Sequence, residues 1–131
     1  MKSFTSLEQS KKLAEILPIE SADMLHCLSF DGDLLSTVPK QYSGSFKHQP
    51  ELTIPCWSLA ALLQVLPLGI YDEFDDCDYE LEIDMIDKMP RYIRLGDIYH
   101  SKFPYDFEKD TLLDNVVESI IWLNDNNYFE L

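Results

Sequence analysis

The fold of this chain depends first on the stretch Ile54-Pro55-Cys56-Trp57-Ser58-Leu59-Ala60-Ala61-Leu62-Leu63-Gln64-Val65-Leu66-Pro67, a run of helix-forming residues between two prolines. Only Ser58 and Gln64 are polar between those prolines. A helix that is apolar on nearly every side must be covered on most of them, so the stretch predicts a central core helix at about 55–66. Pro55 is tolerated in the first helical turn, where its missing N–H costs no hydrogen bond, and Pro67 ends the helix.

Two further helices are predicted near the ends of the chain. The first covers about 6–17, with Thr5 or Ser6 suited to the N-cap and a proline directly after its last residue. The second covers about 111–124 and has the clearest amphipathic pattern. Its apolar stripe repeats at spacings of three and four residues and consists of Leu112, Leu113, Val116, Val117, Ile120, Ile121 and Leu123.

Two β-hairpins are predicted between the helices. The first covers about 24–37, because Asp-Gly between apolar runs is a hairpin signal and Gly32 tolerates the positive φ of a tight turn. The second covers about 77–95 and begins with the period of a half-buried strand. In that strand the residues Cys77, Tyr79, Leu81, Ile83 and Met85 alternate with the acidic residues Asp78, Glu80, Glu82 and Asp84.

The register of the second hairpin follows from keeping charges off the core face. A turn at 86–90 places Glu82 opposite Arg94 and leaves the other face apolar, whereas a turn one residue shorter inverts the faces. The longer turn is therefore predicted. Glu82 and Arg94 would then be exposed cross-strand neighbours that stabilise the hairpin by about 0.2–1 kcal/mol.

Together these elements predict an α+β fold in which three helices pack on one antiparallel sheet built from the two hairpins. Residues 1–131 are expected to form a single domain, because this length buries a sufficient core. Helices and strands do not alternate as βαβ units, so a doubly wound nucleotide-binding fold is not expected. The open face of the sheet is expected to carry acidic side chains.

The composition excludes several function classes. Ten Lys and Arg residues stand against 24 acidic residues, which gives a formal net charge of -14. Nucleic-acid backbones and anionic membranes both bind positive surfaces, so direct binding to either is not expected. No apolar run has the roughly 18 residues that a membrane span needs, and the first residues lack the apolar core of a signal peptide. A cytoplasmic protein with a basic protein partner is expected.

No catalytic, cofactor-binding or metal-binding residue is predicted. Cys27, Cys56 and Cys77 match neither a disulfide framework nor a metal knuckle, and the sequence has no nucleophile elbow, P-loop, dinucleotide fingerprint or zincin motif. Cys56 and Trp57 are pocket candidates, because the first turn of a helix lowers the pKa of a thiol. The opposing interpretation is a buried cysteine that acts as a small hydrophobe, since no spacing places a histidine beside it.

The main candidate site is a protein-interaction surface on the acidic hairpin and the aromatic segment after it. Its predicted residues are Asp72, Glu73, Asp75, Asp76, Asp78, Glu80, Glu82, Asp84, Arg94, Tyr99, Phe103 and Tyr105. A calcium loop is not expected, because the glycine and the distal glutamate of an EF-hand are missing. One strand is also too dilute to imitate DNA, since carboxylates two residues apart are separated by about 6.8 Å, whereas a duplex carries one charge per roughly 1.7 Å.

Three blocks of the chain resemble a family of small uncharacterised proteins common in prophages and mobile elements of gut bacteria. The blocks are Leu7-Glu8-Gln9-Ser10-Lys11-Lys12-Leu13-Ala14-Glu15-Ile16-Leu17-Pro18, Pro55-Cys56-Trp57-Ser58-Leu59-Ala60-Ala61-Leu62-Leu63 and residues 114–123. Relatives are more aromatic after the central helix, so the acidic run is a departure from the family. The family has no established activity, and the resemblance implies only a phage or prophage accessory protein in a bacterial cytoplasm.

These observations favour a small interaction or inhibitor module that binds a host protein. The alternative is a small-molecule-binding protein or an enzyme with a pocket near Cys56 and Trp57. A third hypothesis is self-association through the last helix or an open sheet edge. The three hypotheses differ in whether the acidic surface, a pocket or an apolar face makes the functional contact.

Overall fold

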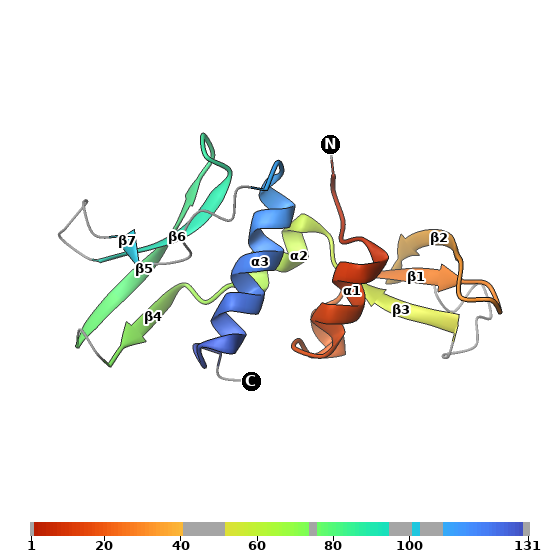
Figure 1. Cartoon of the computed structure of the whole chain (residues 1–131), viewed down its shortest axis with the longest axis horizontal. Coiled ribbons are helices and arrows are strands. Elements are labelled where there is room, and N and C mark those ends of the chain that lie inside the picture. Colours follow the sequence, from red (N-terminus) through yellow and green to blue (C-terminus); the bar gives the residue numbers. More distant parts are fainter. Residues whose placement is uncertain (1, 41–51, 74–75, 95–100, 103–108, 130–131) are drawn as a thin grey trace. The chain divides into compact units, whose positions relative to one another are not determined.

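The chain groups into two compact units, residues 1–65 and residues 66–130, which we call the N-terminal and C-terminal units. In this computed structural model (Figure 1) the described residues are 2–40, 52–73, 76–94, 101–102 and 109–129. The predicted α+β class is confirmed, with three α-helices and antiparallel strands. The two predicted hairpins are present, but the expectation that they share one sheet is wrong, because each pairs with different outer strands. A single domain over residues 1–131 stays a prediction.

The N-terminal unit contains a three-stranded antiparallel sheet with the strand order β2-β1-β3. The predicted first hairpin is formed by β1 and β2, and Gly32 supplies its turn with a φ of 87°. The elements of the unit are α1 (Leu7–Ala14), the 3-10 helix η1 (Ile19–Ser21), β1 (Met24–Leu28), β2 (Leu34–Pro39), β3 (Thr53–Cys56) and α2 (Leu59–Val65).

Helix α1 begins with a capping box at Ser6, one of the two predicted N-cap residues. The Ser6 hydroxyl accepts a hydrogen bond from the Gln9 N–H, and the Gln9 side chain accepts one from the Ser6 N–H. The helix ends at Ala14, earlier than predicted, because the chain tightens there and the Ile16 N–H bonds to the Leu13 carbonyl three residues before it. Helix α1 packs against β3 (Figure 1).

The predicted core helix is divided between a strand and a helix. Residues Thr53–Cys56 form β3, which pairs with β1 and lies at the edge of the sheet, where the missing N–H of a proline is tolerated. Helix α2 therefore begins at Leu59, and the Ser58 hydroxyl caps it by accepting a hydrogen bond from the Ala61 N–H. The stretch still supplies the core of this unit, in which Cys56, Trp57 and Leu62 are all 0% exposed.

The C-terminal unit contains a four-stranded antiparallel sheet with the order β4-β5-β6-β7 and one helix that packs against β6. Its elements are β4 (Gly69–Asp72), β5 (Cys77–Asp84), β6 (Met89–Arg94), β7 (Ser101–Lys102) and α3 (Leu112–Asp125). The predicted apolar stripe of α3 supplies the core, with Val116, Ile120 and Leu123 all 0% exposed. Of the helices in the described ranges, none is long and apolar enough to cross a membrane.

The predicted register of the second hairpin is wrong. The turn lies at 85–88, Ile83 faces Pro90, and Glu82 faces Arg91 in place of Arg94. Lys88 adopts a φ of 55°, which lets the chain reverse early, and Pro90 becomes a buried residue of β6. The alternation within β5 is unaffected, but the shift of three residues inverts β6, so Tyr92 is buried and Ile93 lies opposite Glu80.

Candidate functional site

Strand β5 presents a row of carboxylates on one face of the sheet in the C-terminal unit. Asp78, Glu80 and Glu82 are exposed, while Tyr79 on the opposite face is 3% exposed. We call these three carboxylates the acidic face. The predictions that this strand alternates and that its open face carries acids are confirmed.

Tyr71 adds an aromatic ring to the acidic face. It lies opposite Asp78 in the pairing of β4 with β5, and half of its side chain is exposed. Its hydroxyl donates a hydrogen bond to the Asp76 carboxylate, which is the largest cause of a raised pKa of Tyr71. Carboxylates beside an aromatic ring form a surface that suits Lys and Arg side chains.

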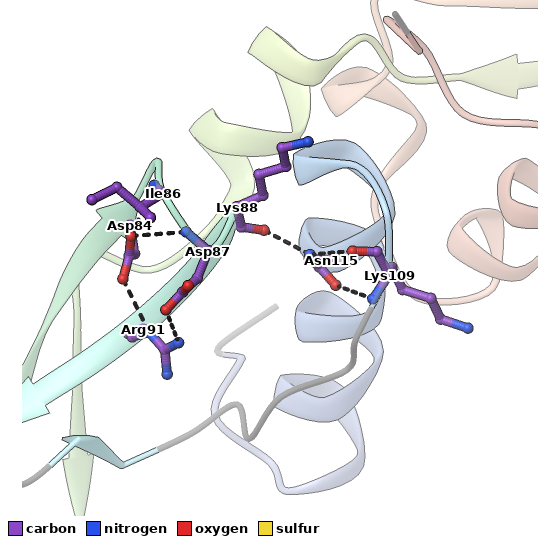
Figure 2. A network of polar contacts seen from close by, with 7 residues as sticks. All are labelled: Asp84, Ile86, Asp87, Lys88, Arg91, Lys109 and Asn115. Atoms are coloured by element: carbon purple, nitrogen blue, oxygen red, sulfur yellow. Dashed lines mark hydrogen bonds and ion pairs between the residues drawn. The ribbon is translucent and has the colours of Figure 1, made fainter.

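The β5–β6 turn at 85–88 is held by polar contacts (Figure 2). Asp84 Oδ1 accepts hydrogen bonds from the N–H groups of Ile86 (3.0 Å) and Asp87 (3.1 Å). Arg91 forms ion pairs with Asp84 (3.7 Å) and Asp87 (3.1 Å). The hydrogen bond from the Asp87 N–H is the largest of the contacts that lower the pKa of Asp84. Asp84 is therefore engaged in shaping the turn.

Asn115 attaches the same turn to α3 (Figure 2). Its side chain is buried, and Nδ2 donates hydrogen bonds to the carbonyls of Lys88 (2.6 Å) and Lys109 (3.3 Å). Its Oδ1 accepts a hydrogen bond from the Lys109 N–H at 3.2 Å. Asn115 is not among the predicted site residues. An amide that directly precedes Val116, inside the apolar stripe of the helix, is the sequence signal that identifies it.

The other predicted surface residues lie in different environments. Glu73 and Asp76 are exposed, whereas Asp72 is only 3% exposed, so its assignment to the surface is wrong. The alternation of β4 explains this, because it directs Asp72 to the buried side and Tyr71 to the exposed side. Arg94 is exposed and faces Tyr79. The predicted residues Asp75, Tyr99, Phe103 and Tyr105 lie outside the described residues.

The pocket candidates Cys56 and Trp57 have no exposed surface. Cys56 belongs to β3, so the expected effect of a helix terminus on its thiol is absent. Burial raises the pKa of Cys56, which keeps the thiol protonated and makes it a poor nucleophile. Cys56 Sγ lies 3.5 Å from Thr5 Oγ1, which in turn lies 2.7 Å from Ser10 Oγ.

His26 completes this buried polar cluster in the N-terminal unit. Its Nε2 lies 2.9 Å from the carbonyl of Thr5 and 3.0 Å from Ser10 Oγ, and its Nδ1 lies 2.7 Å from Thr37 Oγ1. A carbonyl only accepts, so Nε2 carries the proton and Nδ1 accepts from the Thr37 hydroxyl. Burial lowers the pKa of His26, which favours this neutral form. The position of Ser10 on the side of α1 that carries Leu13 is the signal for the cluster.

A cavity of about 290 Å³ reaches His26 in the N-terminal unit. The ring of Phe4 meets the His26 ring edge-on with 6.2 Å between their centroids. The cavity is lined by Lys2, Ser3, Phe4, Thr5, Ser6, Leu7, His26 and Leu34. Both ring nitrogens of His26 are engaged in the fold, so the cavity lacks a poised base. Its lining offers an aromatic wall and one cation.

Within the described part of the chain, no group of three His, Cys, Asp or Glu residues could hold a metal ion. Comparison of the chain with protein-family models, with curated proteins and with solved structures finds no match. Each unit therefore has its own candidate features, which are the acidic face and the β5–β6 turn in the C-terminal unit and the buried His26 cluster in the N-terminal unit.

Proposed function

We propose that this chain is a non-catalytic interaction or inhibitor module, a phage or prophage accessory protein that binds a basic host protein in the bacterial cytoplasm. The supporting observation is the acidic face, in which Asp78, Glu80 and Glu82 are exposed together while the reverse face of β5 carries the buried Tyr79 and half-buried apolar residues. Because these three side chains lie on the exposed side of β5, a partner can bind them without entering the core.

The distribution of charge along the chain supports the same proposal. Residues 66–131 contain 17 of the 24 acidic residues and five of the ten Lys and Arg residues. Residues 1–65 contain seven acidic residues and the other five cations. A concentrated negative potential accelerates the approach of a basic partner and makes the association sensitive to salt.

The proposal is tested by neutralising the acidic face in the full chain. The triple variant Asp78→Asn/Glu80→Gln/Glu82→Gln and the unaltered protein are used to retain a host protein from a bacterial lysate. The retained protein is then purified, and its affinity is measured at low and high salt. The matched control removes the same charge from exposed positions of the N-terminal unit, as Glu8→Gln/Glu15→Gln/Glu20→Gln.

The acidic-face variant is expected to lose about ten-fold or more in affinity and to show a weaker salt dependence, while the control triple retains its affinity. Equal losses in the two triples would show that only the net charge matters. Retention of no host protein by the unaltered chain would contradict the proposal outright.

The second candidate function is binding of a small molecule in the cavity beside His26. The favouring observation is an aromatic and aliphatic lining with Lys2 as its cation, which suits a ligand that has an apolar body and one acidic group. Thermal-shift screening of aromatic carboxylic acids tests this function. Stabilisation that Leu34→Arg abolishes would support it, since Leu34 is a half-exposed wall of the cavity.

A further inference from the structure

The β5–β6 turn displays two large apolar side chains to solvent. Met85 is 68% exposed and Ile86 is 92% exposed. Such a turn ordinarily favours Gly, Asn, Asp, Pro or Ser, each of which satisfies the backbone geometry better than isoleucine does. At this degree of exposure neither side chain contributes appreciable burial to the core. The pair therefore has no evident part in stabilising the fold.

The turn that carries the pair is held from both ends. Asp84 fixes the backbone at Ile86 and Asp87, while Asn115 holds the carbonyl of Lys88 at 2.6 Å. All of these contacts are made by the backbone or by neighbouring side chains, and in Figure 2 the Ile86 side chain extends away from Asn115. An apolar pair on a fixed backbone loses little conformational entropy when it enters a partner.

We propose that Met85 and Ile86 are the anchor of the interaction surface, and that Ile86 enters an apolar pocket of the partner protein whose rim carries Lys or Arg side chains. This inference rests on the proposed function and identifies the partner surface. Asp84 and Asp87 flank the pair, and the acidic face continues from Glu82 along the same strand. Arg91 already pairs with Asp84 and Asp87, whereas Glu80 and Glu82 are exposed further along β5, so the cations of the partner's rim are expected to meet the acidic face.

The same charges argue against the two other ways of covering the pair. An anionic membrane repels a chain with a net charge of -14. A second copy carries the same net charge of -14, so two chains that approach through this turn repel each other. A partner surface with an apolar pocket and a basic rim is complementary both to the exposed apolar pair and to the nearby carboxylates.

The test begins with photocrosslinking in bacterial cells that express the full chain. Ile86→p-benzoylphenylalanine identifies the protein that contacts the turn, and Leu68→p-benzoylphenylalanine is the matched control, because Leu68 is 84% exposed in the same unit. The crosslinked protein is then purified. Its affinity is measured for the unaltered chain, Ile86→Ser, Leu68→Ser and the acidic-face triple.

Crosslinking from position 86 and a loss of about thirty-fold in Ile86→Ser, the scale of an interface hot spot, are expected. Leu68→Ser should bind as the unaltered chain does. If the acidic-face triple loses affinity and Ile86→Ser does not, the proposed function stands and the anchor is overturned. If the crosslinked species is a second copy of the chain, or if no protein is crosslinked, the anchor is likewise overturned.

Discussion

Replacing Asn115 with alanine is expected to detach the β5–β6 turn from α3. The substitution removes three hydrogen bonds, to the Lys88 carbonyl and to the carbonyl and N–H of Lys109. At about 1 kcal/mol for each hydrogen bond, the gross loss is about 3 kcal/mol. Alanine returns about 0.6 kcal/mol through its higher helix propensity. Lys88 and Lys109 are exposed, so water can hydrogen-bond to their freed backbone groups and reduce the loss of stability. A net destabilisation of about 1–2.4 kcal/mol follows.

Urea unfolding followed by circular dichroism measures this loss, and hydrogen exchange at the Ile86 and Asp87 amides reports on the turn itself. Asn124→Ala is the matched control, because Asn124 is an exposed residue of the same helix. It is expected to leave the exchange unchanged. If Asn115→Ala is as stable as Asn124→Ala, and the two turn amides exchange at the original rate, the reasoning about this attachment is refuted.

Three further outcomes follow from the N-terminal unit and the thiols. Burial lowers the pKa of His26 below its value of about 6.5 in an unfolded chain. The unfolded state therefore binds a proton at this residue more readily than the folded state does. The free energy of unfolding should therefore fall as the pH decreases through 6.5 toward the lower folded pKa, and urea midpoints should fall less steeply over this window in His26→Gln. In the native state a thiol reagent should label the half-buried Cys77 quickly and the buried Cys27 and Cys56 only on unfolding, as mass spectrometry of digests would show. Ser6→Ala should lower the free energy of unfolding by about 1 kcal/mol through loss of the N-cap, with Ser6→Asp close to the original value in the same urea titration.

Local signals in the sequence were sufficient to predict the structure wherever nearby residues alone determine it. The N-cap at Ser6, the turn at Gly32 and the apolar stripe of α3 are each set by residues within a few positions, and each is observed as predicted. The start of α2 was not predictable in this way. Thr53–Cys56 becomes a strand because β1 offers it an open edge, and that edge depends on residues about thirty positions away.

The register of the β5–β6 hairpin shows a second limit. Alternation identifies which residues of β5 share a face, but it does not state where the return strand begins. That position depends on the left-handed backbone of Lys88 and on the acceptance of Pro90 inside β6. Neither residue type predicts this from the sequence, since lysine seldom adopts a positive φ and proline usually marks the end of a strand.

The candidate site was predictable to a similar degree. Asp78, Glu80 and Glu82 were identified by their spacing, because exposure follows from alternation alone. The cluster of His26 with Ser10 was not identified, since it joins β1 to α1 through tertiary contacts. Polar residues inside otherwise apolar stripes are the general sign of such contacts, because a buried polar group requires a partner.

The acidic face also bears on how the protein behaves at high concentration. Strand β4 lies at the edge of its sheet, and an open edge is a template on which other chains can aggregate. This edge is only four residues long, and the neighbouring strand carries Asp78 and Glu80 beside it. Two molecules that meet edge to edge must bring like charges together, so the carboxylates of the proposed interaction surface also protect the sheet edge against aggregation.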